Sequence, residues 1–548
     1  MVLQEMESKA DMPDTMGVKL AKDFERIRSD RSNWERHWQK INDVIVLSRD
    51  FTIQRNPGDE RRRAIYDDTA PHAHKVLSAA IHGLLTNPGT KWFLLRANDP
   101  FVQNDPDSIF WMQDTVDRVL ALYATSRFGF DQNIQAVYHD STGFGISGTY
   151  VVEEDGQMRI RCVPLPQIYI EVNEKGEEIH VVRKLKMRCD EIFATWGGKS
   201  SKEVLKKITD GKGEEKREVI HSVRPRNMRN IRSMRPSNMA WQSIYMDLDD
   251  MHIMSEGGFR ENPYIIFRWD RYPGDAYGFG PGNNALHETA SANSIRRTML
   301  MAGEKAADPM MEVVANGIEG PMRSRPGSII YTRAGMGGPV VRPIAHGGNT
   351  AVGLQELEQA RNTIRKIFFN DVVGPVENLS RTNELAVQAM FSQRAQLMSP
   401  NISRLQSSLS KVIARTIGMM QRRGDLLPMP PAMLNSREDL AIEYVSPLAN
   451  AQKASDVSAI QQWIQSLVPM AQINPNVLRK VDTDAVAELS AKALNVPIQA
   501  VKSQDQVQQE IQQEQQAQQS QAQVQQAQGA ASAALDGARA IEALSNAG

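Results

Sequence analysis

The feature that most constrains this chain is a pair of helical patterns on either side of a glycine- and proline-rich stretch. Residues 284 to 306 form the first pattern, and its apolar face is Ile295, Met299, Ala302 and Ala306. Asp308 and Pro309 end it. Residues 353 to 369 form the second pattern, with apolar residues at steps of three, four and three: Leu357, Ala360, Ile364 and Ile367.

The stretch between the two patterns, residues 310 to 350, is rich in Gly and Pro and holds only short Ile/Val runs, which predicts a small β-loop element. Two helices flanking so small an element cannot bury both of their faces within one subunit. A closed ring of identical copies would cover the remaining faces. We therefore expect Leu357, Ala360, Ile364 and Ile367 to contact a neighbouring subunit.

The rest of the chain predicts an α+β protein that is mainly helical. Apolar residues at helical spacing run from Leu20 to Ile45, and a second helix follows with Thr69 as N-cap. Segments 106 to 124 and 129 to 139 also have helical character, and Ser399 with Pro400 would cap a further helix. At 548 residues the chain exceeds one hydrophobic core, and we expect about three or four compact units.

From about residue 148 the apolar period changes to two, in β-branched runs separated by Gly-containing turns, which predicts an antiparallel β module of about 50 residues. An Arg-rich stretch from Lys216 to Arg235 follows. It is a solvated loop or a subunit contact, or it contacts nucleic acid. The tract from residue 503 to residue 548 is rich in Gln and Ala and predicts a helical or disordered tail.

Composition excludes several classes of protein. Lys plus Arg (64) nearly cancels Asp plus Glu (65), for a net charge of -1, which does not favour tight general DNA binding. The two cysteines, Cys162 and Cys189, are too few for a disulfide scaffold or a zinc site. No secretory signal or membrane span is evident, so we expect the chain to be made in the cytosol, with no membrane partner.

Motifs that could carry chemistry are incomplete. GFGISG at 143 to 148 fits the dinucleotide glycine pattern but follows a predicted helix and opens a predicted strand. WGGKS at 196 to 200 lacks the first glycine of a phosphate-binding loop, because position 193 is Phe193. We expect His72, His74 and His82 to be core or surface residues and not metal ligands. The sequence therefore predicts no enzyme, no cofactor and no metal.

Four blocks, in order along the chain, resemble the head-to-tail connector (portal) family of short-tailed bacteriophages. They are IYDDTAPHAHKVLSAAIHGLLTNPGTKWFLL (65 to 95), RYPGDAYGFGPGNNAL with a nearby ADP (271 to 309), RTNELAVQAMFSQRAQLMSPNISRL with the later GDLLPMPP (381 to 431), and YVSPLANAQK (444 to 453).

The resemblance implies a ring of typically twelve subunits at one capsid vertex, in the virion and, during assembly, in the host cytoplasm. Double-stranded DNA would pass through the ring, and the partners would be terminase, capsid and scaffolding proteins, and tail adaptor proteins. A DNA-packaging ATPase and a non-specific DNA-binding protein are the alternatives, which the missing phosphate-loop residues and the balanced charge disfavour.

The resemblance also implies a portal-like architecture of wing, stem, clip and crown or barrel. The regions would be 1–280 (wing), 281–309 (first stem helix), 310–350 (clip), 351–370 (second stem helix), 371–382 (tunnel loop), 383–450 (wing and crown helices), 451–502 (crown) and 503–548 (tail or barrel helix). Candidate DNA-channel residues near the expected tunnel are Arg365, Lys366 and Arg381.

Overall fold

The structure is a computed structural model. It describes residues 15–53, 55–56, 58–59, 65–229, 235–307, 309–313, 341–343, 350–373, 384–436 and 440–445, with isolated positions at 463–465, 467 and 486. The chain divides into two compact units, residues 1–444 and 445–548, and not into the three or four that its length suggests. The predictions for 451–502, for the tail 503–548 and for most of the segment 310–350 lie outside the described residues.

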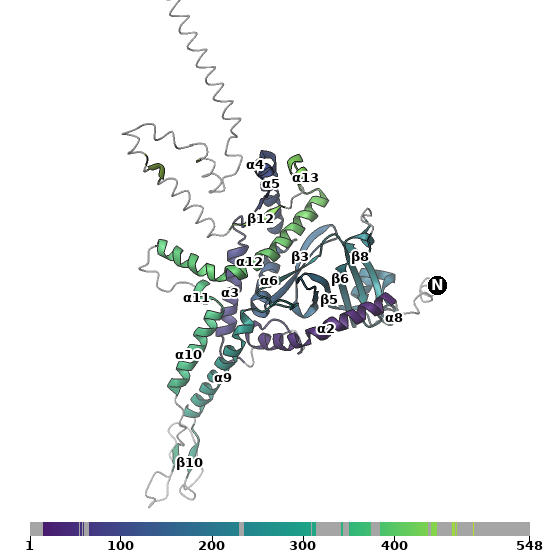
Figure 1. The fold of residues 1–548 in the computed structure, drawn as a ribbon. Coiled ribbons are helices and arrows are strands. Elements are labelled where there is room, and N and C mark those ends of the chain that lie inside the picture. Colours follow the sequence, from purple (N-terminus) through teal and green to yellow (C-terminus); the bar gives the residue numbers. More distant parts are fainter. Residues whose placement is uncertain are drawn as a thin grey trace, which may run out of the picture. The chain divides into compact units, whose positions relative to one another are not determined.

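The first unit combines helices with antiparallel sheets (Figure 1). Its longer helices are α2 (Thr15–Ile41), α3 (Thr69–Leu85), α5 (Pro106–Tyr123), α6 (Phe130–Phe144), α9 (Pro281–Ala307), α10 (Thr350–Ile367) and α12 (Glu384–Arg423). Its shorter helices are η1 (Asn42–Val46), α4 (Pro100–Asn104), α7 (Cys189–Trp196), α8 (Lys202–Thr209), α11 (Asn370–Val373) and α13 (Pro431–Ser436).

Two larger sheets replace the single β module expected from the sequence. One has the order β3-β2-β9, from strands β2 (Ile146–Glu154), β3 (Gln157–Val163) and β9 (Tyr264–Arg268). The other has the order β4-β5-β6-β7-β8, from strands β4 (Ile168–Val172), β5 (Glu178–Arg188), β6 (Lys216–Pro225), β7 (Trp241–Asp247) and β8 (His252–Phe259). Antiparallel pairing is confirmed throughout both sheets.

The basic stretch from Lys216 begins as a central strand and not as a loop. Arg217, on β6, is buried and donates through its Nη2 atom to Asp247 at 3.2 Å, while Nη2 also lies 3.0 Å from Asp250. Because β6 pairs with both β5 and β7, the first part of the stretch is a strand in the interior of the sheet. Only the segment after Pro225 connects strands.

Helix α2 covers the five-stranded sheet with the face that its periodicity predicted. Leu20, Phe24 and Ile27 pack on sheet residues that include Ile220 and Ile244. Buried Arg31 also holds α2 to the sheet, because its guanidinium lies 4.1 Å from the ring centroid of Tyr169 and donates to the main-chain carbonyls of Leu165 and Ile168. Two short ladders complete the first unit: β1 (Phe93–Arg96) pairs with β12 (Ala441–Tyr444), and β10 (Met311–Val313) with β11 (Val341–Pro343).

Helices α6 and α12 both contact the three-stranded sheet. Arg415 of α12 is buried and donates to the carbonyl of Val151 at 2.8 Å and to the carbonyl of Glu261 at 3.0 Å. Burial is the main cause that lowers the pKa of Arg415 to about 10, so the guanidinium stays charged at neutral pH. Helix α12 continues through Pro400, so the predicted cap at Ser399 is wrong. Its exposed Pro400 bends the helix or removes one of its bonds without ending it.

The glycines of GFGISG have a packing role. The motif follows α6 and opens β2, as the sequence predicted, and Gly145 has a φ of +85°. The turn lies directly against the loop before α9, where a Cβ on Gly280 would come within 2.8 Å of the Cα of Gly145. A Cβ on Gly282 would overlap the carbonyl oxygen of Gly143. Two backbone segments far apart in the sequence therefore cross at a distance that only glycine permits.

We expect Gly280→Ala to destabilise the protein by about 1–3 kcal/mol, because the added methyl meets rigid backbone atoms that cannot move aside. Gly83→Ala is the matched control, since Gly83 lies on the exposed side of α3 with no atom near its would-be Cβ. The control should be neutral or more stable by up to about 1 kcal/mol. Denaturant unfolding followed by circular dichroism measures both, and equal effects would contradict the crossing.

Candidate functional site: the helix pair α9–α10 and its attachment

Helices α9 and α10 lie side by side and antiparallel, and Figure 1 shows them running together away from the sheets toward β10. The predictions of helices at 284–306 and 353–369 are thus confirmed. Burial is uneven along the pair. The buried residues of α9 all lie between Pro281 and Asn293, whereas beyond Asn293 the helix is partly or fully exposed.

The inner part of α10 belongs to the core of its own chain. Leu357, Ala360 and Ile364 are buried within a single copy, where α10 packs against α9 and α3, and Ile367 is half-buried. The prediction that this seam requires a neighbouring subunit is therefore wrong for Leu357, Ala360 and Ile364, because the same chain already covers them. The three-four-three spacing identified a buried face correctly but not its partner.

A buried carboxylate joins the helix pair to the segment before α3. Asp67 is almost fully buried, and its Oδ2 accepts from Arg361 of α10, with Nη2 at 2.7 Å and Nε at 2.8 Å. Its Oδ1 accepts from the backbone N–H of Thr69 at 3.0 Å, so Asp67 orients the start of α3 although Thr69 itself is not the N-cap. Both nitrogens of Arg361 donate to the same carboxylate oxygen, and hydrogen bonds between charged groups are stronger than those between neutral groups.

Helix α9 holds the same segment from its other side. The side-chain oxygen of Asn293 accepts from the backbone N–H groups of Tyr66 and Asp67, both at 2.9 Å. The guanidinium of Arg297 lies 5.8 Å from the centre of the Tyr66 ring. Residues 66–67 are consequently clamped between one polar side chain of α9 and one of α10. We call this cluster the Asp67 clamp; it consists of Tyr66, Asp67, Asn293, Arg297 and Arg361.

The clamp shifts the ionisation of its carboxylate. Burial would raise the pKa of Asp67, but hydrogen bonds from Thr69 and Arg361 outweigh it and hold the pKa below its ordinary value. A carboxyl whose pKa is depressed in the folded state adds stability above its unfolded pKa, and this stability is lost as the pH falls through the folded pKa. At neutral pH the clamp is therefore fully formed.

His74 of α3 lies near Phe368, which directly follows α10. It is fully buried on α3, its Nε2–H donates to the carbonyl of His139 at 2.9 Å, and its ring centroid lies 5.9 Å from that of Phe368. Burial, with a smaller contribution from His139, lowers the pKa of His74 to about 3. His221, a buried residue of β6 that is hydrogen-bonded to the hydroxyl of Tyr264 of β9, likewise has a pKa lowered to about 3, mainly by burial. Both are core histidines and remain neutral in the fold.

Of the predicted channel residues, Arg365 and Lys366 are exposed at the inner end of α10, whereas Arg381 lies outside the described residues. Arg365 donates to Glu358 at 3.1 Å and to Asn362 at 2.9 Å. Position 371, the expected start of a tunnel loop, lies within helix α11. Asp67 lies in the first block that resembles the portal family, and Asn293 and Arg361 lie in the two helical patterns, but neither periodicity nor a motif indicated that the three meet.

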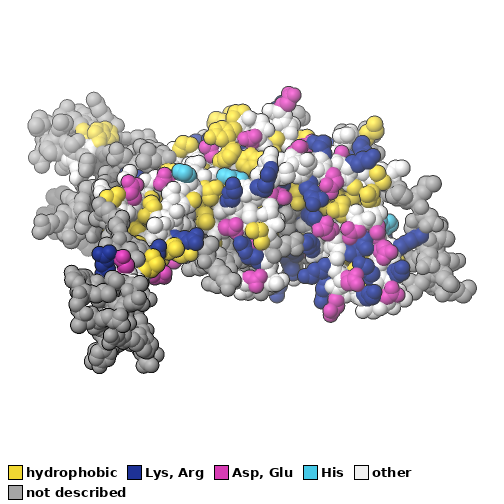
Figure 2. Space-filling model, turned by 90° about the horizontal axis from the view of Figure 1, so that it is seen from below, with side chains coloured by type: hydrophobic (Ala, Val, Ile, Leu, Met, Phe, Trp, Pro, Cys, Tyr) yellow, Lys and Arg dark blue, Asp and Glu magenta, His cyan; other side chains and the backbone are white. Residues whose placement is uncertain are grey.

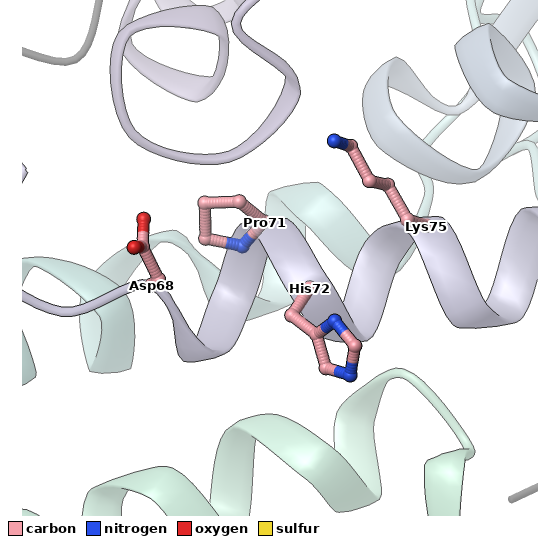
Figure 3. A pocket seen from close by; sticks show the side chains of 4 residues that line it. All are labelled: Asp68, Pro71, His72 and Lys75. Carbon is pink, nitrogen blue, oxygen red and sulfur yellow. The ribbon is translucent and has the colours of Figure 1, made fainter.

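A cavity of about 190 Å³ borders the first turns of α3, lined among the described residues by Asp68, Pro71, His72 and Lys75 (Figure 3). Figure 3 shows that the charged groups of Asp68 and Lys75 and the ring of His72 do not converge on one point. Within the described part of the chain, no set of three or more His, Cys, Asp or Glu side chains is arranged to hold a metal ion. Nor does any described helix have the length and apolar character to cross a membrane.

Sequence comparison identifies the class of protein to which this helix pair belongs. A family model described as "Bacteriophage head to tail connecting protein" matches residues 18–501. The chain belongs to this family.

The portal protein of Salmonella phage epsilon15 is 26% identical over 510 residues, which is 91% of each chain. The probable portal protein of Bordetella phage BPP-1 is 24% identical over 492 residues, which is 88% of each chain. A chain from the neck of a native GTA particle, computed with C12 symmetry, has a TM-score of 0.37 and 10% identity over 73% of this chain and 88% of that one. The role of this chain is that of a portal, or head-to-tail connector.

We expect Arg361→Ala to destabilise the protein by about 3 kcal/mol, because it leaves the buried Asp67 carboxylate without its cation. Arg365→Ala removes an arginine one turn further along, whose ion pair with Glu358 is exposed. This control should cost less than about 1 kcal/mol. Thermal unfolding of both variants tests the clamp, and equal losses would mean that Asp67 does not depend on Arg361.

We expect the unfolding temperature to fall as the pH drops from 6.5 to 5. A histidine whose folded pKa is lowered binds its proton in the unfolded chain first, so stability is present above the unfolded pKa of about 6.5 and decreases by about 1.4 kcal/mol per pH unit below it. His74→Gln should reduce the slope of stability against pH by the contribution of one histidine, which is at most about 1.4 kcal/mol per pH unit. An unchanged slope in this variant would show that His74 is protonated in the fold.

Proposed function

We propose that this connector acts as the repeated subunit of a ring, typically of twelve copies, at one capsid vertex of the virion. Double-stranded DNA passes through the ring during packaging and ejection. The ring is a structural conduit and not an enzyme, and it uses no cofactor. In the host cytoplasm it assembles with capsid and scaffolding proteins, meets the terminase during packaging, and later binds the tail adaptor proteins.

Within such a ring, α9 and α10 are the stem, and the element between them, 310–350, is the clip. The sheets and their helices within 1–280 are the wing, continued by 383–450. Residues 371–382 are the tunnel loop, 451–502 the crown, and 503–548 a tail or barrel helix. The family match over residues 18–501 reaches from the proposed wing to the proposed crown.

One observation supports the ring above all others: the outer part of the helix pair exposes apolar side chains. Four large apolar residues of the two helices are at least 41% exposed in the single chain: Leu300, Met301, Val352 and Leu354. Just beyond α9, Met310, Met311 and Val313 are at least 39% exposed. Large apolar side chains exposed in number on one part of a protein are typical of an interaction site. A ring would bury it by placing each helix pair against the next copy.

Charge distribution is consistent with a conduit that does not hold DNA tightly. Figure 2 shows basic and acidic side chains interspersed over the face that it presents. A channel that gripped many phosphates would slow the passage of DNA, because each phosphate contact adds to the affinity. Arg365 and Lys366, exposed on α10, are proposed to give weak, non-specific contacts along the bore, together with Arg381.

We expect Leu354→Glu to abolish ring assembly without unfolding the subunit. Leu354 is 54% exposed in the single chain, so a carboxylate is tolerated there, but burying it at every interface would cost several kcal/mol per copy. Gln355→Glu, which places the same charge at the next exposed position of α10, should assemble normally. Negative-stain microscopy and light scattering after size exclusion decide; rings of full mass from Leu354→Glu would refute this interface.

A further inference from the structure

Two apolar side chains stand out on the first unit because almost nothing covers them. Met228 is 90% exposed and Phe101 is 88% exposed, the highest values among the large apolar side chains that the structure describes. They lie in regions of opposite charge, and neither belongs to the helix pair α9–α10. An exposed Phe or Met in a charged surround is a common feature of protein interfaces.

The first region is an acidic surface formed by α4, the start of α5, and α13. Helix α4 packs against both α5 and α13, and Figure 1 shows the three together. Val102 and Met433 face inward, whereas their neighbours Phe101 and Leu434 face solvent, and Phe110 adds a further exposed ring. The short helices thus carry apolar side chains on both sides, and those on the outer side are open to solvent in the single chain.

The charge of the acidic surface comes from a stretch without basic residues. Residues 97–117 hold five aspartates and no Lys or Arg, and two of the five are paired with basic residues just outside this range, Asp114 with Arg118 and Asp117 with Lys91. Asp99 and Asp105 cap α4 and α5, accepting from the backbone N–H groups of Phe101 and Ser108. Asp107 lies in the first turn of α5 and is exposed. The surface therefore presents a carboxylate to solvent close to the exposed ring of Phe101.

The second region is the basic loop that begins after β6, and residues 226–229 are its first described part. The sequence from Arg224, near the end of β6, to Arg235 contains five arginines and no acidic residue. Arg224 and Arg226 contact acidic groups of their own subunit, Asp23 at 3.5 Å and Glu256 at 2.9 Å. Arg229 is exposed beside Met228. The loop therefore presents a cation and a flexible apolar side chain together.

We propose that the acidic surface of one subunit binds the basic loop of the adjacent copy, as a second contact of the ring. Each side offers what the other lacks: Phe101 and Asp107 on one, Met228 and Arg229 on the other. Opposite charge sets the register of two surfaces and disfavours other pairings. Sulfur–aromatic and arginine–aromatic contacts add attraction between such groups.

The two regions differ from each other, so the contact is heterologous. A heterologous contact repeats head to tail and closes into a ring when its rotation permits, whereas a contact between identical patches gives only a dimer. In Figure 1 the elements of the acidic surface lie apart from β6 and β8, so one copy can use both regions at once, each toward a different neighbour. This inference rests on the proposed ring and specifies which surfaces meet in it.

Cysteine cross-linking tests the contact directly. The double variant Phe101→Cys with Met228→Cys, oxidised mildly, should give a ladder of covalent oligomers on a denaturing gel, extending beyond the dimer. Each single variant, and the unaltered chain with only Cys162 and Cys189, should give no ladder. A band no larger than a dimer would overturn the heterologous contact, and so would monomer alone from rings seen intact by microscopy.

Charge exchange supplies the matched test. Asp107→Arg and Arg229→Asp should each raise the subunit concentration needed for half-maximal ring assembly about fivefold, and the two together should restore most of it. Glu203→Arg is the control, because Glu203 is also an exposed acid in the first turn of a helix, α8. It should leave assembly unchanged. Additive losses in the double variant would overturn the pairing.

The outcomes separate this inference from the proposed function. If the unaltered protein forms no rings, the proposed function fails. If it forms rings that Asp107→Arg and Arg229→Asp leave intact, the ring stands and this contact is overturned. A loss of binding to a labelled DNA duplex in Arg229→Asp, with ring assembly and the cross-linked ladder unaffected, would assign the basic loop to nucleic acid instead.

Discussion

The described architecture depends on how a slender pair of helices is held at one end. Beyond the turns nearest the sheets, α9 and α10 mainly contact each other. The direction in which they run is therefore set where they join the sheets and α3. The Asp67 clamp does this with buried polar groups: a carboxylate bound to Arg361, and backbone N–H groups bound to Asn293. Such groups are costly to separate, because each would remain buried without a partner.

Close contact between backbone segments also fixes this junction, where the start of α9 meets the start of β2. The turn between α6 and β2 crosses the loop before α9 so tightly that glycine is required on both segments. Helix α9 therefore leaves the sheet at a position fixed by main-chain atoms and not by adaptable side chains.

The two proposed interfaces would contribute differently to ring assembly. Apolar side chains on the outer helix pair, such as Leu354, would supply most of the free energy, because burying apolar surface stabilises an interface more than exposed charge pairs do. Charged side chains on the acidic surface and the basic loop would mainly fix orientation and exclude wrong pairings.

The sequence by itself determined what depends on local order along the chain: the helical faces of α2 and α10, the antiparallel strands, and the four blocks that resemble connector proteins. It also predicted α9 as a helix, but the predicted face of Ile295, Met299, Ala302 and Ala306 is not buried, and the buried residues of α9 lie nearer its start. Only the tertiary structure shows which elements pack against each of these helical faces. Periodicity shows that Ile364 is buried, but only the fold shows that α9 and α3 bury it. Likewise Asp67 and Arg361 are 294 residues apart, and a pair that distant leaves no spacing in the sequence, because it forms only when separate elements meet.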